Sequence, residues 1–103
     1  MRSSLITLLL APVAVLSLTT IVGENTTGPQ CCDKGTPDPS KHCSSIGLNA
    51  YCCSTNRNDE GGGCDVVDIF KLGRTVKGFA ARSTCSRVNE VGDTLVGFVG
   101  CAE

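Results

Sequence analysis

Aromatic residues are scarce in this 103-residue chain, which has no tryptophan, one tyrosine (Tyr51) and three phenylalanines. With so few large side chains, the hydrophobic core must be thin. A chain of this size buries too little apolar surface to fold comfortably without additional restraints. The sequence therefore predicts a fold that is held together by something other than core packing.

Histidine is nearly absent as well, since His42 is the only one. Any Ser–His–Asp or Cys–His arrangement would have to use it. Its neighbour Cys43 is expected to be disulfide-bonded and so unable to act as a thiolate. Asp65 and Asp68 are a carboxylate pair, but a glycosidase also needs a deep groove for its sugar. We expect no enzymatic activity, no catalytic residue and no cofactor.

The spacing of zinc knuckles is also missing. Structural zinc sites use Cys-x2-4-Cys, whereas this chain has the adjacent pairs Cys31-Cys32 and Cys52-Cys53. Neighbouring residues of an extended strand point to opposite faces. Each pair should therefore send one bridge to each side of a sheet rather than bridge within itself. We predict disulfides and no metal site.

Eight cysteines are the most informative residues that the chain does have. An even number of cysteines in a short exported chain is typical of a disulfide framework. The sequence leaves the pairing open. The predicted disulfide cysteines are Cys31, Cys32, Cys43, Cys52, Cys53, Cys64, Cys85 and Cys101.

The N-terminus has the layout of a secretory signal peptide. Arg2 supplies a positive charge, an apolar run extends from Leu5 to Leu18, and small residues follow. We predict a signal peptide over residues 1–23, cleaved after Ser17 or after Gly23. An uncleaved membrane anchor is the alternative, although a proline and several hydroxyl side chains make it a weak spanning segment. We expect a secreted, extracellular protein with no membrane span after cleavage.

The remainder is predicted to be a flexible N-terminal tail over residues 24–30 and a single disulfide-stapled domain over residues 31–103. The tail is polar and holds the only glycosylation sequon, Asn25-Thr26-Thr27. N-glycosylation of Asn25 and an unused sequon are both open.

The predicted fold is small, disulfide-rich and mainly β, a few-stranded antiparallel sheet with at most one short helix. The segment Thr94–Cys101 is the most apolar and should be a central, buried strand. The stretch Asp65–Leu72 is ambiguous between a short helix, a strand edge and a loop. Further strands are predicted at 46–54 and 74–79, an irregular loop at 33–41 and a turn-rich connection at 55–63. We expect a monomer.

Basic residues are concentrated between residues 71 and 87, where no acidic residue occurs, although the whole chain has a net charge of −1. This segment is a candidate binding patch for an acidic host protein or an acidic glycan of a cell wall. The alternative is a solvated hairpin face that deters edge-to-edge pairing. Nucleic acid is not expected, because the chain is acidic overall and aromatic residues do not interleave these charges. The patch consists of Lys71, Arg74, Lys77, Arg82 and Arg87.

A leader followed by a domain with adjacent cysteine pairs resembles the small secreted cysteine-rich proteins of filamentous fungi. The stretches that carry the resemblance are Tyr51-Cys52-Cys53-Ser54, Gly63-Cys64-Asp65, Gly73-Arg74-Thr75-Val76 and Gly97-Phe98-Val99-Gly100-Cys101-Ala102. These proteins include effector candidates of the biotrophy-associated type. The resemblance implies a secreted effector that binds host molecules in the apoplast or at a host–pathogen interface, and so promotes colonisation or modulates host defence.

Two other protein classes remain as alternatives. The spacing from Cys43 through Cys52-Cys53 to Cys64 is similar to that of fungal hydrophobins, which coat surfaces. The chain departs from that pattern because a cysteine pair comes first and two single cysteines follow. An antifungal or killer-type toxin is the other alternative, and such toxins usually have a more basic mature chain.

Overall fold

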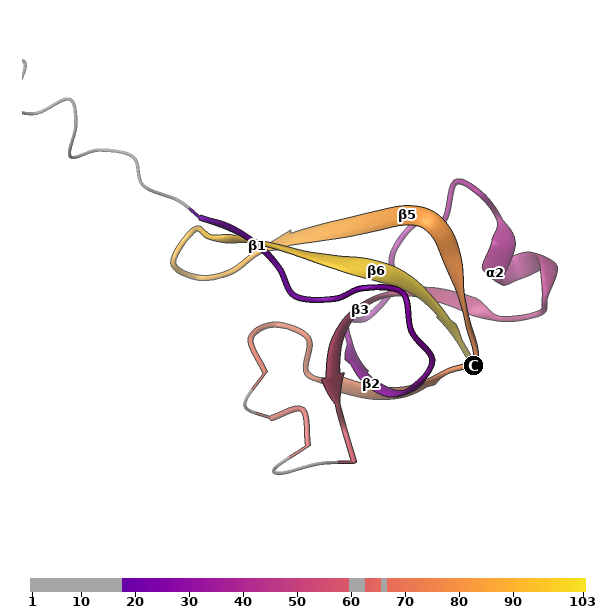
Figure 1. Cartoon of the computed structure of the whole chain (residues 1–103), viewed down its shortest axis with the longest axis horizontal. Coiled ribbons are helices and arrows are strands. Elements are labelled where there is room, and N and C mark those ends of the chain that lie inside the picture. Colours follow the sequence, from indigo (N-terminus) through magenta and orange to yellow (C-terminus); the bar gives the residue numbers. More distant parts are fainter. Residues whose placement is uncertain (1–17, 60–62, 66) are drawn as a thin grey trace, which may run out of the picture.

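The computed structural model describes residues 18–59, 63–65 and 67–103 (Figure 1). The predicted leader lies outside these residues up to Ser17. No helix of the described segments is long and apolar enough to cross a membrane.

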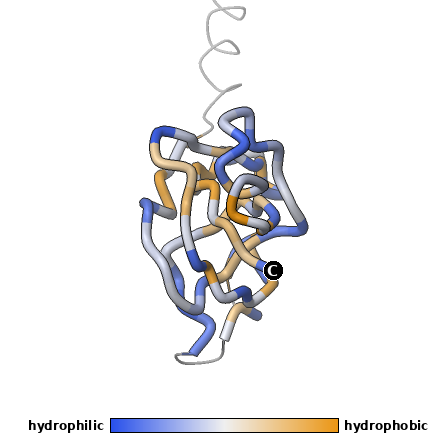
Figure 2. Tube along the Cα trace, turned by 90° about the vertical axis from the view of Figure 1, so that its right-hand side faces the viewer, coloured by the Kyte–Doolittle hydropathy of each residue, from blue (hydrophilic) through white to orange (hydrophobic). Residues whose placement is uncertain are grey.

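The described chain is mainly β-structure with one short helix, as predicted. Its strands are β1 (Thr19–Ile21), β2 (Gly28–Cys32), β3 (Asn49–Arg57), β4 (Leu72–Val76), β5 (Gly78–Val88) and β6 (Thr94–Ala102). The helix α2 (His42–Ser45) follows the predicted irregular loop. Figure 2 shows that hydrophilic stretches gather in the outer turns of the trace.

Strand β6 is the centre of the sheet, which confirms the prediction for the apolar segment Thr94–Cys101. Along one edge β6 pairs first with β1 and then with β3, and along the other edge it pairs with β5. Strand β2 continues the sheet between β3 and β4. The pairs are antiparallel except β1–β6, which is parallel. Lys77 N also donates to Cys101 O (2.8 Å), which brings the end of β4 back to β6.

The two faces of the sheet bury two separate clusters, because side chains alternate along each strand. On β6, Val99 and Cys101 belong to one cluster, and Phe98 and Ala102 belong to the other. The adjacent cysteines divide in the same way: Cys31 and Cys52 lie in the first cluster, and Cys32 and Cys53 in the second. The prediction that the two cysteines of each adjacent pair point to opposite faces of the sheet is therefore confirmed.

All eight cysteines form disulfides, which confirms the predicted framework. Cys32 and Cys53 face each other across β2 and β3, so one bridge joins the two adjacent pairs. The other bridges tie the strands to the helix, to the loop that precedes β4 and to β5. The four bridges are Cys31–Cys64, Cys32–Cys53, Cys43–Cys101 and Cys52–Cys85.

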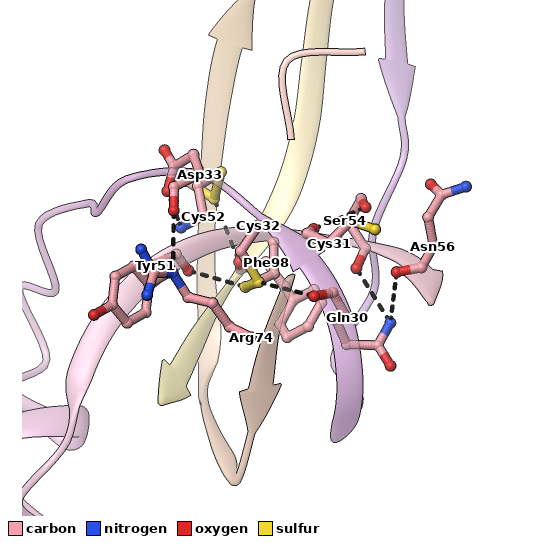
Figure 3. Close-up of a disulfide and its surroundings, with 12 residues drawn as sticks. Gln30, Cys31, Cys32, Asp33, Tyr51, Cys52, Ser54, Asn56, Arg74 and Phe98 are labelled. Atoms are coloured by element: carbon pink, nitrogen blue, oxygen red, sulfur yellow. Dashed lines mark hydrogen bonds between the residues drawn. A yellow bond between two sulfur atoms is a disulfide. The ribbon is translucent and has the colours of Figure 1, made fainter. Parts of the chain in front are cut away.

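Part of the predicted tail differs in the structure. Gly28–Gln30 belong to β2, and Gln30 is buried with 1% of its surface exposed. Its side-chain amide donates to Thr55 O (2.8 Å) and lies close to two neighbouring carbonyl groups of β3 (Figure 3). These backbone acceptors satisfy the buried amide of Gln30. Gln30 is therefore a fixed part of the sheet, although its polar side chain suggested a flexible tail.

The ambiguous stretch Asp65–Leu72 is a loop that leads into β4, not a helix. Residue 66 lies outside the described residues, and Val67–Ile69 form bends before Leu72 begins the strand. Ile69 has a positive φ of 48°, which a right-handed α-helix does not allow. Phe70, a residue of this loop, is buried in the first cluster.

Candidate functional site

The predicted basic patch is dispersed over three places in the structure. Lys71 and Arg87 line one pocket, while Arg74 and Lys77 line a second, smaller one beside the C-terminus. Arg82 lies elsewhere on β5, at an irregularity where the pairing with β6 shifts between Phe79 and Thr84. The five cations are therefore not one continuous surface.

Three members of the predicted patch, Arg74, Lys77 and Arg87, have intramolecular partners, and those of Arg87 are described with Asp33 below. The guanidinium of Arg74 lies over the ring of Tyr51, 3.7 Å from its centroid (Figure 3), and its Nε donates to Asp33 O (3.3 Å). Lys77 pairs with Glu103 at 3.1 Å, and both side chains are at least half exposed. Arg74 covers the rim of the second cluster and so contributes to the fold.

Asp33 lies beside the pocket that Lys71 and Arg87 line, and it connects the loop after β2 to β3 and β5. Its carboxylate accepts hydrogen bonds from the backbone N–H of Gly35 (3.0 Å) and of Cys52 (2.8 Å). It also forms an ion pair with Arg87 of β5 (2.5 Å). Only 12% of the Asp33 side chain is exposed, so little water competes for these contacts. Asp33 thereby fixes the loop that follows β2 against both β3 and β5.

The Asp33 pocket, as we call it, has a volume of about 540 Å³ and opens to solvent between this loop and β5. Its lining combines cations with aliphatic side chains. Leu72 is 40% exposed and Val88 is 65% exposed. The lining residues are Asp33, Lys34, Gly35, Ile69, Lys71, Leu72, Arg87 and Val88.

The charge of the Asp33 pocket is positive. Asp33, the one acidic residue among the described lining residues, is neutralised by Arg87. Lys34 and Lys71 are exposed and pair with no carboxylate among the residues that the structure describes. Two uncompensated ammonium groups next to exposed aliphatic side chains suit a ligand that is both anionic and apolar.

A further pocket, of about 570 Å³ and separate from the two described above, lies between α2 and β5 and contains His42. Its described lining residues supply hydroxyl and basic groups, and none of these described residues is a carboxylate. The carboxylate of Asp38, before the helix, accepts a hydrogen bond from Cys43 N (3.0 Å), and its hydrogen bonds with Ser40 and Cys43 lower the pKa of its carboxyl group. This carboxylate is therefore engaged in local structure rather than free to orient His42. Asn25 of the sequon is exposed.

Sequence reasoning missed Asp33 and Lys34 because it treated the loop after Cys32 only as irregular. The spacing Asp33-x-Gly35 was a usable signal, since aspartate side chains accept from the backbone two residues ahead. Nothing in the sequence indicated that Arg87, which is far along the chain, would meet this turn.

The fold and the pocket define a small disulfide-stapled β domain with a positively charged surface site. A family model described as a family of unknown function (DUF6413) matches residues 25–102, and the chain belongs to this family. No curated protein and no solved structure matches it.

Proposed function

We propose that this protein is a secreted binding protein without catalytic activity, and that the Asp33 pocket is its binding site. Four disulfides in a short chain fit an extracellular protein, because such bridges persist in oxidising compartments. The observation that carries the proposal is the pair of cations Lys34 and Lys71, which have no carboxylate partner in the part of the chain that the structure describes, beside the exposed side chains of Leu72 and Val88.

The chemistry of the pocket favours an acidic protein segment over an acidic glycan. Carboxylates of the partner would meet Lys34 and Lys71, and aliphatic side chains would cover Leu72 and Val88. A glycan would satisfy the two cations but would leave the aliphatic side chains without a matching surface. The Asp33–Arg87 pair holds the site in place before binding, which lowers the entropic cost of association.

The resemblance to small secreted fungal proteins supports a finer proposal. In this proposal the protein acts as an effector at a host–pathogen interface, where binding to an acidic host protein promotes colonisation or modulates defence. A protein stapled by four bridges is suited to a protease-rich extracellular space, because bridges suppress the unfolded state that proteases cleave.

The test compares two synthetic ligands on the oxidised protein. A fluorescent peptide of alternating Glu and Leu residues should bind, and its affinity should fall as salt rises. A heparin oligosaccharide should bind more weakly. The variant Lys34→Glu/Lys71→Glu should lose about tenfold or more in peptide affinity, because it places repulsive charges at the site.

The matched control is Lys41→Glu/Lys77→Glu, which makes the same change in net charge away from the Asp33 pocket. It should retain most of the affinity. Equal weakening by both variants would mean that only the overall charge matters. Tighter binding of heparin than of the peptide would favour a glycan partner.

A further inference from the structure

The segment Leu18–Gly23 overlaps the predicted leader, yet the structure builds it into the sheet. Strand β1 pairs with β6 through Thr19, Thr20 and Ile21 (Figure 1). Val22 N donates to Val96 O (2.8 Å), and Thr55 N of β3 donates to Val22 O (3.0 Å). The segment therefore occupies the edge of β6 that lies beyond the end of β3.

Gly23 shows how closely this segment is packed. It is buried, and a Cβ atom at this position would lie 2.5 Å from Cys53 O and 2.9 Å from Ser54 Cα. Only glycine allows the chain to pass β3 at this distance. Val22 also packs against the first hydrophobic cluster. Cleavage after Gly23 would remove all of these contacts and leave strand β6 with an unpaired edge.

The other predicted cleavage point lies just before this segment. Leu18 is 64% exposed, and its backbone N–H donates to Asp93 Oδ1 (3.1 Å). Its carbonyl oxygen accepts from Thr94 N (2.8 Å). A cut before Leu18 would leave both contacts in place.

We infer that the Ser17–Leu18 peptide bond is the maturation site and that the α-amino group of Leu18 becomes an ion-pair partner of Asp93. One water molecule hydrolyses the bond, giving a carboxylate on Ser17 and an ammonium group on Leu18. The new positive charge replaces a neutral N–H beside the carboxylate of Asp93, and charge-assisted hydrogen bonds are the stronger kind. The small Ser17 side chain suits the residue before a leader cleavage site.

This inference rests on the proposed secretion and makes the leader shorter than residues 1–23. The rival site, after Gly23, has one argument in its favour. The family match begins at residue 25, so a mature chain that starts at Glu24 would nearly coincide with it. The structural contacts of residues 18–23 favour Ser17 instead.

The deciding experiment expresses the full 103-residue chain in a secreting eukaryotic host and sequences the N-terminus of the protein in the medium. The expected sequence is Leu18-Thr19-Thr20. Any other first residue in secreted protein, Glu24 above all, would overturn the inference while leaving secretion intact. A chain retained in cells with Met1 would overturn the proposed secretion as well.

A second measurement tests the structural reason. The secreted chain is compared with one that starts at Glu24 behind a heterologous leader and keeps all eight cysteines. The shorter chain should unfold at a temperature lower by about 10 °C or more, because it loses several backbone hydrogen bonds and the cover of β6. Equal unfolding temperatures would overturn the argument that residues 18–23 belong to the mature fold. The variant Asp93→Asn should lower the unfolding temperature of the secreted chain, whereas the matched variant Glu90→Gln should leave it unchanged.

Discussion

Asp33 offers the sharpest test of how the candidate site is built. Replacing Asp33 by alanine removes the acceptor for Gly35 N and for Cys52 N, which belongs to a fully buried residue. It also leaves Arg87 without its ion-pair partner. An unsatisfied buried donor costs about 1–3 kcal/mol, and a broken ion pair with little exposure adds to that. We expect Asp33→Ala to lower the free energy of unfolding by about 2–4 kcal/mol.

The matched control is Asp59→Ala, which also breaks an ion pair with an arginine. Arg57 and Asp59 are joined by two hydrogen bonds of 3.0 and 2.9 Å, but their side chains are 43% and 48% exposed. Solvent screening makes such surface pairs contribute little. Urea unfolding of both oxidised variants, followed by circular dichroism, measures the difference. Equal destabilisation by the two substitutions would refute the role we give to Asp33.

Four other features of the structure can be tested in the same way. Removing the bridge between Cys43 and Cys101, which spans 58 residues, by a double alanine substitution should cost about 3–4 kcal/mol in unfolding free energy, measured by urea denaturation. Gln30→Leu should lower the unfolding temperature, because it leaves the carbonyl group of Thr55 without its side-chain donor and must fit a larger apolar group at a closed site. The lowered pKa of Asp38 stabilises the fold above the ordinary carboxyl pKa, and this contribution is lost as pH falls through the lower folded-state value. Asp38→Asn should therefore reduce the unfolding temperature at pH 6 and flatten its fall in acid. The oxidised protein should leave the wettability of a surface unchanged, since the exposed aliphatic side chains of the described residues are not on long loops. A clear change in contact angle would favour the hydrophobin-like alternative.

The central strand and the division of the cysteines between two faces were predictable from local patterns. The apolar run from Thr94 to Cys101 and the turn residues before it indicate a buried strand, and Gly92 does adopt a positive φ of 90° in that turn. Adjacent cysteines on strands must point to opposite faces. These features depend on alternation along the chain, which a sequence displays directly.

The remaining features depend on contacts between distant residues. The length of β5 was not predicted, because an irregularity around Arg82, with a φ of 128°, interrupts its alternation. Strand β1 was concealed because its composition matches that of a leader. The Asp33 pocket forms only when β5 brings Arg87 to the turn after β2, so no local pattern contains it. The same holds for the disulfide pairing.

The most direct test of the account is a map of the binding surface by nuclear magnetic resonance. The uniformly ¹⁵N-labelled, oxidised protein is titrated with the alternating Glu-Leu peptide, and the shifts of the backbone amide signals are followed. We expect saturable shifts confined to the lining of the Asp33 pocket, with Lys34, Gly35, Lys71, Arg87 and Val88 among the residues affected. Shifts centred on the pocket around His42, or no saturable shifts at all, would contradict it.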